Sequence, residues 1–451
     1  MSFLDSEFFQ PLFEALKRDH PEDIRAATSA YNAADLAEFI ESSIQDGDAG
    51  LKLLRLLSLE QQAKVFGYLG PDMQLVLARL IPNKELVTLV TAMSADERAD
   101  FFNLLDENEQ HALFQSLASR EREDLRRLAS FEEGTAGALM TSDYAMVSSG
   151  MSVAAALSLL RNTAPDKETI YQAYVIDKDH RLKGAISLRK LITSAPGAIV
   201  DTLMATGLVS ARTHTGQEEV ARLISRYDLL ALPIIDDNER LVGIVTYDDA
   251  MDVAEAEATE DIHKGATVGR IDTSLKTASP FSLYRSRVQW LVILVFANIF
   301  TGAGIAYFED IISSHIALLF FMPLLVASAG NAGAQSATLM VRGLATGDVS
   351  AKDWGRLLVK DIMVASGLGL TMAAAVMVVG IFRAGPEIAL VVSITMVAVV
   401  LIGSVIGMLL PFLLAKLKFD PATASTPLIT TIADVSGVLI YFSIATAILG
   451  L

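Results

Sequence analysis

The sequence predicts a membrane protein of several domains: an all-α superhelical domain, an α/β tandem pair, a connecting helix and five transmembrane helices. Three observations predict this class. Five long apolar runs fill the last third of the 451-residue chain, one unit occurs twice before them, and short helical segments occupy the first part. Because these three sequence patterns occupy separate stretches of the chain, we expect separate domains.

Charge divides the chain at about residue 285. The formal net charge is −17, and residues 1–284 hold 27 Lys and Arg against 45 Asp and Glu, whereas the remainder holds 9 against 8. An acidic soluble half repels nucleic acid and attracts cations. With no Cys and six scattered His, a bound metal is expected to be a hard ion held by oxygen, such as magnesium, calcium or manganese.

Residues 1–132 are expected to form short helices. Ser58-Leu59-Glu60-Gln61 and Ser94-Ala95-Asp96-Glu97 each fit a capping box, in which Ser accepts from the third backbone amide and Glu or Gln reaches back. Apolar positions follow both at helical spacing, and the two signals lie 36 residues apart. A helical solenoid and a plain helical bundle both account for this pattern. The first residues, MSFLDSEFFQ, do not resemble a signal peptide, so we expect a cytoplasmic N-terminus.

The repeated unit covers residues 133–194 and 195–253. In each copy a helix precedes an apolar strand, a turn and a second strand that starts at Gly184 or Gly243. The two copies resemble a tandem pair of CBS domains, and the resemblance implies that Thr246 and Asp249 stand where such domains often meet a nucleotide ribose. The first copy has Lys190 in place of that Asp. ATP is therefore a candidate ligand that Lys190 argues against, because Lys cannot accept hydrogen bonds from ribose hydroxyls.

An acidic segment, YDDAMDVAEAEATEDIHK, leads out of the second repeat into a connecting helix expected within residues 254–284. Ala and Glu favour helix, and like charges three or four residues apart repel unless something neutralises them. An ordinary solvated acidic face and a divalent-cation site both account for this composition.

Five apolar runs follow at about residues 288–307, 316–341, 362–382, 388–415 and 427–451 within a domain of residues 285–451. Each has at least the roughly 20 residues that cross a bilayer. Basic residues gather before the first run and in the second and fourth joints, which by the positive-inside rule places the acidic half in the cytoplasm and the C-terminus outside. The odd number of spans favours a symmetric dimer.

Asp434 is the one acidic or basic residue inside these runs. A charge at mid-membrane costs roughly 2.5–3.5 kcal/mol on insertion scales and is retained mainly where it faces a cavity or an ion. Thr430 precedes it by one turn, and Asn331 and Gln335 are amides within a glycine-rich part of the second run. Two structural explanations stay open: a helix-packing seam for the glycines, and an Asp434 that is protonated or bonded to Asn331.

Taken in order, the helical domain, the two repeats, the acidic helix, the five spans, GNAGAQSATL and DPATASTPLITTIADVSGVLIY resemble the MgtE family of magnesium channels and transporters. The resemblance implies a homodimer in a lipid bilayer, with a central pore where Asp434 of both subunits binds hydrated magnesium and where the acidic helix acts as a plug. It also implies regulatory magnesium ligands: Glu60, Asp96, Asp100, Glu218, Asp228, Asp249, Asp252, Glu257, Glu260, Asp261 and Asp420. The chain departs from the family at Gly216, where a carboxylate is often found, and at Thr426, where an Asn often lines the pore.

We therefore expect a magnesium-selective channel or transporter of the bacterial inner membrane, driven by the ion gradient and membrane potential. Cytosolic magnesium bound between the N, CBS and plug domains is expected to close it. The alternatives are a CBS-regulated transporter of another divalent cation (cobalt or manganese) or of an anion or osmolyte, and a membrane-anchored sensor that transports nothing. The chain contains no P-loop pattern and no nucleophile–base arrangement, which argues against a pump and against an enzyme.

Overall fold

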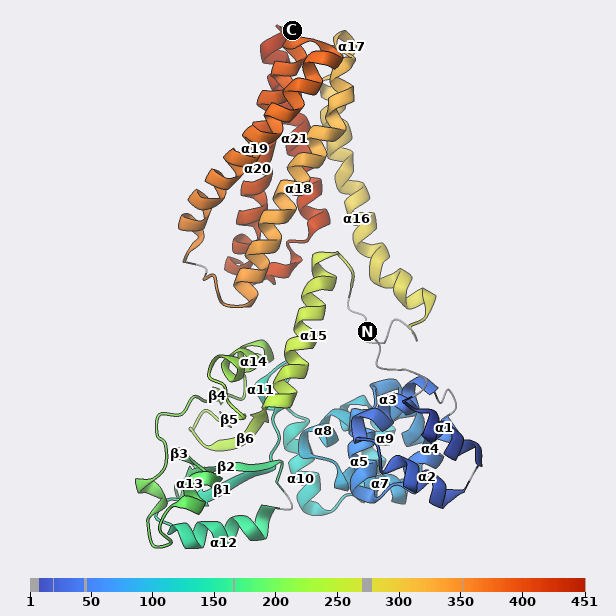
Figure 1. The fold of residues 1–451 in the computed structure, drawn as a ribbon, viewed down its shortest axis with the longest axis vertical. Coiled ribbons are helices and arrows are strands. Elements are labelled where there is room, and N and C mark those ends of the chain that lie inside the picture. The colour runs from blue at the N-terminus through green and yellow to red at the C-terminus, as the bar shows by residue number, and fades with distance from the viewer. Residues whose placement is uncertain are drawn as a thin grey trace. The chain divides into compact units, whose positions relative to one another are not determined.

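The structure is a computed structural model. It describes residues 8–18, 20–43, 47–164, 167–269, 278–350 and 352–450, and for residues 42, 43 and 47–49 it describes the backbone alone. The chain forms two compact units, Met1–Ala254 and Glu255–Leu451, and the boundary lies within one helix. Figure 1 shows helices and small sheets in the first unit and long helices in the second.

The first part of unit one is helical. Its helices are α1 (Gln10–Arg18), α2 (Pro21–Thr28), α3 (Ala33–Ser43), α4 (Gly47–Leu56), α5 (Leu59–Tyr68), α6 (Pro71–Leu80), α7 (Asn83–Ala92), α8 (Ala95–Leu104), α9 (Glu107–Ser116) and α10 (Ser119–Leu128). Helix α1 packs on α2, and from α2 onward each helix packs on the helix two places later, as α5 does on α7 and α6 on α8. This stacking is that of a solenoid rather than a plain bundle, so the superhelical prediction is confirmed.

From α5 to α10 every helix has ten residues, and each helix begins twelve residues after the first residue of the previous one. The residue after each helix is apolar and buried at the first five of these ends: Leu69, Ile81, Met93, Leu105 and Leu117. A buried residue at each helix end fixes where the chain turns, and it explains how two-residue links suffice.

The two predicted capping boxes have different outcomes. At Ser58 the side-chain oxygen accepts from the Gln61 amide and the Gln61 side chain accepts from the Ser58 amide, so this box is confirmed. Ser94 does stand at a helix start, but its side chain accepts no capping bond, so that prediction is wrong. The second box of the series lies instead at Asp106 and Glu109. Both predicted helices form, because burial of their apolar faces does not depend on the cap.

The second part of unit one contains two three-stranded sheets of the same topology, ordered β1-β2-β3 and β4-β5-β6. In each, the first pair is parallel and the second antiparallel. The elements are α11 (Ala136–Leu139), β1 (Tyr144–Ser148), α12 (Val153–Thr163), β2 (Thr169–Ile176), β3 (Leu182–Ser187), α13 (Leu188–Thr193), η2 (Val200–Thr202), β4 (Ala211–Arg212), α14 (Gln217–Arg226), β5 (Ala231–Ile235) and β6 (Leu241–Thr246).

The last strands begin two residues before the expected glycines, at Leu182 and Leu241. The glycines lie inside the strands because a neighbouring segment crosses close to each. A Cβ atom at Gly184 would lie 2.5 Å from the Ala205 carbonyl oxygen, and one at Gly243 would lie 2.6 Å from the Met140 sulfur. The glycines are therefore sites of close packing rather than turn residues.

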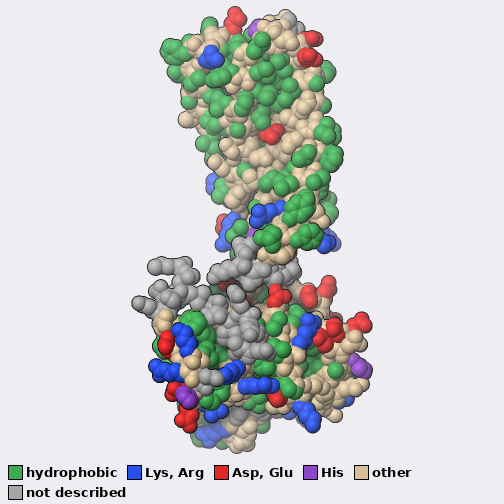
Figure 2. All heavy atoms as spheres, turned by 90° about the vertical axis from the view of Figure 1, so that its right-hand side faces the viewer, with side chains coloured by type: hydrophobic (Ala, Val, Ile, Leu, Met, Phe, Trp, Pro, Cys, Tyr) green, Lys and Arg blue, Asp and Glu red, His purple; other side chains and the backbone are tan. Residues whose placement is uncertain are grey.

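Helix α15 (Tyr247–Gly265) carries the acidic segment and crosses the boundary between the units. Unit two continues with α16 (Pro280–Tyr307), α17 (Glu309–Ser314), α18 (Ala317–Ala345), α19 (Trp354–Ala384), α20 (Pro386–Lys416), η3 (Pro421–Thr423) and α21 (Thr426–Leu449). In the described residues five of these helices are long and apolar enough to cross a membrane: α16, α18, α19, α20 and α21. Figure 2 shows many hydrophobic side chains on the visible face of this part of the molecule and most of its basic side chains near one end.

Helices α18 and α20 pack backbone to backbone. A Cβ atom at Gly403 would collide with the Ala329 carbonyl oxygen, and one at Gly407 with that of Gly333. Glycines at this spacing let two helices approach without side chains between them. The helix-packing explanation of the glycines thus holds for this pair, and the amides of the same segment need a separate explanation.

Candidate ion-binding sites

Asp434 lies seven residues after Pro427 in α21, about 10 Å along the helix at 1.5 Å per residue. The helix begins cleanly because the Ser425 side chain accepts from the Leu428 amide and Pro427 occupies the first turn. The Asp434 side chain is partly exposed. Among the described residues no group hydrogen-bonds to its carboxyl, so the bond to Asn331 is absent from this structure.

Asn331 and Gln335 lie one helical turn apart on α18, and both side chains are exposed in the single chain. Within the described residues neither makes a protein hydrogen bond. Two amides left without partners on an apolar helix would cost free energy against lipid. Their placement therefore suits a water-filled or ion-filled space.

The threonines of α21 have different surroundings. Thr430 donates its hydroxyl hydrogen to the Pro427 carbonyl oxygen at 3.0 Å, which leaves its oxygen free to accept but gives it no proton for another acceptor. It also packs against α18, since a Cβ atom at Gly330 would lie 3.0 Å from its methyl carbon. Thr426 lies at the first residue of the helix and is exposed.

Unit two also contains the acidic end of α15. Glu257, Glu260 and Asp261 lie there, and Lys264 bridges this end to the loop before α21. The Lys264 ammonium nitrogen lies 2.5 Å from an Asp420 carboxylate oxygen and also contacts Glu260. Burial lowers the pKa of Lys264, but the hydrogen bonds to Asp420 and Glu260 outweigh it, so the pKa is raised. Burial, and then the charge of Asp420, raises the pKa of Asp261.

The sequence pattern of this segment points to its acids and not to Lys264. The signal was present, because Glu260 and Lys264 stand four residues apart on a helix, a spacing that favours an ion pair. The contact with Asp420 could not be found this way, since it joins residues 156 positions apart.

In unit one, α8 and the first turn of α15 contribute a partly buried group of carboxylates, the Asp96 group: Asp96, Glu97 and Asp249. Burial raises the pKa of Asp96, and one of its carboxylate oxygens is buried without a hydrogen-bond partner among the described residues. Burial, and then the charge of Asp96, raises the pKa of Glu97 to about 7 and that of Asp249 to about 7. The Thr246 hydroxyl donates to Asp249.

Glu97 stands at the third position of the predicted Ser94 capping box, and the structure also places it in this carboxylate group, where hydrogen bonds from Ser94 lower its pKa less than burial raises it. Gly67 of α5 makes room for it, because a Cβ atom there would collide with the Glu97 carboxylate. A glycine inside a helix is an unfavourable choice unless something approaches it closely, and this was the available signal.

The remaining predicted ligands are dispersed. Glu60 pairs with Lys64 at 3.0 Å on the exposed face of α5. Asp100 lies one turn after Asp96, Glu218 is exposed in the first turn of α14, and Asp252 is exposed on α15. Asp228 follows α14 and is exposed, with the left-handed backbone angle φ of 49°. In the parts of the chain that the structure describes, no three acidic or His side chains converge closely enough to hold a bare metal ion.

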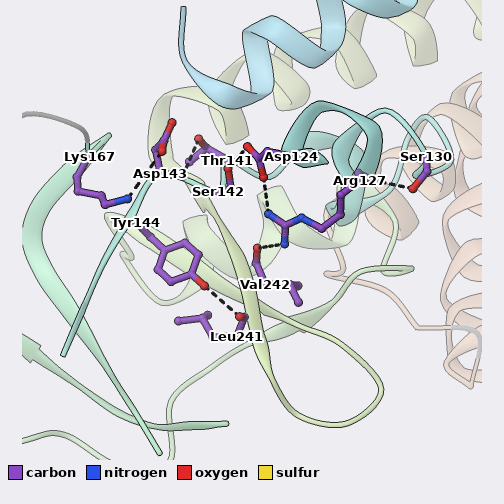
Figure 3. A network of polar contacts seen from close by, with 10 residues as sticks. All are labelled: Asp124, Arg127, Ser130, Thr141, Ser142, Asp143, Tyr144, Lys167, Leu241 and Val242. Carbon is purple, nitrogen blue, oxygen red and sulfur yellow. Dashed lines mark hydrogen bonds and ion pairs between the residues drawn. The ribbon is translucent and has the colours of Figure 1, made fainter. Parts of the chain in front are cut away.

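A polar network joins α10 to the sheets within unit one, as Figure 3 shows. Asp124 accepts from Arg127 at 2.8 Å and from Ser142 at 2.7 Å, and Arg127 also donates to the Val242 carbonyl oxygen at 3.1 Å. The Tyr144 hydroxyl donates to the Leu241 carbonyl oxygen at 3.0 Å. The bonds of Arg127 to Val242 and of Asp124 to Ser142 join α10 to the repeat pair, so they hold the solenoid against it and thereby hold Asp96 and Glu97 near Asp249.

The features relevant to nucleotide binding are mixed. Lys190 is exposed on α13, and its backbone amide donates to the Ser187 hydroxyl. Gly216 precedes α14 and supplies no side-chain cap. Thr246 and Asp249 bond to each other, and the structure places Asp249 with the acids of α8.

Asp361 is a further carboxylate that sequence reasoning missed. In the sequence it precedes the third apolar run by one residue, but α19 begins at Trp354 and so includes it. Its oxygens accept from Ser336 of α18 and Ser404 of α20.

Comparison with known proteins covers nearly the whole chain. Residues 322–444 match the MgtE family described as a divalent cation transporter, residues 31–134 match the MgtE intracellular N domain, and residues 136–197 and 200–256 match the CBS domain. The magnesium transporter MgtE of Thermus thermophilus is 40% identical over 442 residues, which are 97% of this chain and 95% of that protein. The chain belongs to the MgtE family of magnesium transporters.

Other MgtE proteins agree with this assignment. The magnesium transporter MgtE of Bacillus subtilis is 35% identical over 88% of each chain. A crystal structure of the cytosolic domain of the Mg2+ channel MgtE in complex with ATP is 38% identical, with a TM-score of 0.52, and covers 54% of this chain and 98% of that one. The predicted family and fold class are thus confirmed, and the function of MgtE relatives is transport rather than catalysis.

Proposed function

We propose that this MgtE protein conducts magnesium along a path lined by Asp434, Asn331, Gln335, Thr430 and Thr426. The observation that carries the proposal is a carboxylate within a membrane helix that has no protein hydrogen bond among the described residues. Magnesium gives up its waters reluctantly and prefers an octahedron of oxygens. Unpaired carboxylate and amide groups can hold such a hydrated ion through its water shell.

The ion itself is the substrate, and no other energy source is needed. An inside-negative potential favours entry of a divalent cation by about 4.6 kcal/mol per 100 mV, twice the value for one charge. We infer that the ion gradient and this potential drive transport.

We further propose a homodimer in the bacterial inner membrane. Asn331, Gln335 and Thr426 are exposed in one chain, and a second copy around a two-fold axis would enclose them and pair two Asp434 carboxylates. The basic side chains near one end of the helices support a cytoplasmic acidic half and an external C-terminus.

We propose that cytosolic magnesium closes the path by binding at the acidic positions of both units. In unit one, Asp96 and Asp249 lie near Glu97, and Asp100 stands one helical turn after Asp96 on the exposed side of α8. Glu60, Glu218, Asp228 and Asp252 supply further negative charge. In unit two, Glu257, Glu260, Asp261 and Asp420 would hold the ion. The unpartnered Asp96 oxygen supports this role, because a buried acceptor without a donor suits a hydrated cation.

ATP is a second ligand to test. A relative's cytosolic domain was crystallised with ATP, and Thr246 and Asp249 are present here, but Lys190 and the bond between Thr246 and Asp249 oppose a ribose contact.

Purified protein in liposomes tests transport directly. We expect magnesium uptake to fall at least tenfold in Asp434→Ala, while the matched Asp310→Ala variant, whose carboxyl lies on α17 outside the apolar helices, keeps full uptake. Competing cobalt or manganese that enters faster than magnesium would favour a different divalent substrate. No flux of any divalent cation with folded protein would favour the sensor.

A further inference from the structure

Asp361 lies seven residues into α19, a helix long and apolar enough to cross a membrane. An acidic side chain in such a helix is costly to insert. The proposed ion path does not use this carboxylate. Among the described residues, it nevertheless has side-chain partners on two other membrane helices, α18 and α20.

The partners of Asp361 are two buried serines. One carboxylate oxygen accepts from the Ser336 hydroxyl at 3.0 Å, and the other accepts from the Ser404 hydroxyl at 2.9 Å. The two serine oxygens are themselves 2.7 Å apart. Ser336 is 6% exposed and Ser404 is 3% exposed, so the three side chains form a closed polar contact between α18, α19 and α20.

This contact lies at the seam where α18 and α20 touch through backbone. Ser404 follows Gly403, which approaches the Ala329 carbonyl, and Ser336 stands three residues after Gly333, which approaches Gly403 and Gly407. Because its two oxygens accept from one serine on each helix, the Asp361 carboxylate opposes any shift of α18 along α20.

The same segment of α18 carries the amides of the proposed path. Gln335 directly precedes Ser336, and Asn331 lies one turn earlier. On its other side the segment meets α21, where Gly330 packs against Thr430, one turn before Asp434. A shift of α18 by a fraction of a turn would therefore move both amides relative to Asp434.

We propose that Asp361 is a positioning residue for magnesium transport, which through Ser336 and Ser404 holds the Asn331–Gln335 segment in register with Asp434. The proposal rests on the proposed function, because it takes Gln335 and Asn331 to line the ion path. Asp361 acts as a hydrogen-bond acceptor and binds no ion.

The test uses the full-length protein in liposomes, with uptake rates of magnesium and manganese measured for each variant. Asp361→Leu removes both acceptors, whereas the isosteric Asp361→Asn keeps one acceptor and offers an amide donor to the other serine. We expect Asp361→Leu to lower magnesium uptake about tenfold and to reduce the preference for magnesium over manganese, while Asp361→Asn restores most of both. Ser366→Ala, which removes a hydroxyl bonded only within α19, is the matched control and should change neither.

A double-mutant cycle that combines Asp361→Leu with Gln335→Ala shows whether Asp361 acts through α18. We expect the double variant Asp361→Leu/Gln335→Ala to be no worse than the poorer single variant, because both changes disturb one positioned amide. If Asp361→Leu does not fold, Ser404→Ala replaces it, with a smaller loss of the same kind.

Three results would overturn the proposal. If Asp361→Asn lowers magnesium uptake as much as Asp361→Leu does, the charge itself is needed and Asp361 binds the ion. Unchanged selectivity per folded molecule in Asp361→Leu would mean a purely structural anchor. Fully additive effects with Gln335→Ala would mean that the two residues act separately. Failure of the proposed path would differ, because Asp434→Ala and Gln335→Ala would then leave uptake intact whatever Asp361 does.

Discussion

The Lys264 ammonium nitrogen lies 2.5 Å from an Asp420 carboxylate oxygen, so one lysine joins the acidic end of α15 to the loop that leads into α21. Lys264 also contacts Glu260. Two of the proposed magnesium ligands are thus already neutralised by a cation that belongs to the chain. In unit two, magnesium has to compete with this ammonium group.

Replacing Lys264 by Met should therefore strengthen magnesium control. Without the ammonium, Glu260 and Asp420 repel each other and also repel Asp261, which favours the open state when magnesium is absent. The freed carboxylates then bind magnesium more tightly. We expect patch-clamp recordings to show a higher open probability at zero cytosolic magnesium and closure at a lower magnesium concentration.

The matched control for that substitution is Lys183→Met. Lys183 pairs with Asp177 at 3.4 Å on the exposed edge of a repeat, away from the predicted ligands. Lys183→Met should leave unchanged the cytosolic magnesium concentration at which the channel closes. An equal shift of this concentration in both variants would mean that net charge, and not the Asp420 contact, is responsible.

The Asp96 group predicts a pH dependence of stability. The pKa values of Glu97 and Asp249 are raised from 4.5 and 3.8 to about 7, so between about pH 4 and pH 7 the folded protein binds more protons than the unfolded chain. The free energy of unfolding then falls as the pH rises through this window, by up to about 1.4 kcal/mol per pKa unit. Thermal unfolding without magnesium should show a lower midpoint at pH 8 than at pH 5.5.

Magnesium should reverse this loss, since it binds the ionised carboxylates and stabilises the folded state by mass action. We expect a larger magnesium-induced rise of the melting temperature at pH 8 than at pH 5.5. Glu97→Gln, which cannot ionise, should flatten the pH dependence and raise stability at pH 8. A melting temperature that climbs from pH 5.5 to pH 8 in the wild type would contradict the assignment.

The backbone-to-backbone packing of α18 against α20 predicts that substitutions at two glycines change stability differently. Gly407→Ala forces a methyl group onto the Gly333 carbonyl of α18, and such overpacking costs about 1–3 kcal/mol. Gly367→Ala on α19 meets open space and should be neutral or stabilising by up to about 1 kcal/mol, the difference in helix propensity. Thermal unfolding in detergent compares the two, and equal melting temperatures would rule out the seam.

Thr426 predicts a change in selectivity. It is exposed at the start of α21, and an Asn there adds an amide that can hydrogen-bond water on a passing ion. One such bond is worth about 0.5–1.5 kcal/mol, or about two- to tenfold. We expect Thr426→Asn to raise the uptake of magnesium relative to manganese by this factor, while Thr338→Asn, also exposed but on α18, leaves the ratio unchanged.

Much of the architecture could be predicted from local patterns. The five membrane helices follow from apolar run length, the two sheets from the repeated unit, and the Ser58 cap from four consecutive residues. These features depend on residues close together in sequence, where helix and strand periodicity are visible. The candidate ion path also began from such a feature, because Asp434 is conspicuous within an apolar run.

The contacts within the sites could not be predicted in the same way. Asp361 looked like a joint residue until its serine partners on α18 and α20 were known, and Glu97 looked like a cap until α15 was placed beside α8. Lys264 was one charge among many until it reached Asp420.

By itself, then, the sequence determined the membrane class, the order of the domains and the family to which the chain belongs. Only the tertiary structure decided which carboxylates are shared, paired or left without a partner. The physical reason is that the energy of a charged group is set by burial and by neighbours within a few ångströms, and those neighbours come from segments that the linear order keeps far apart.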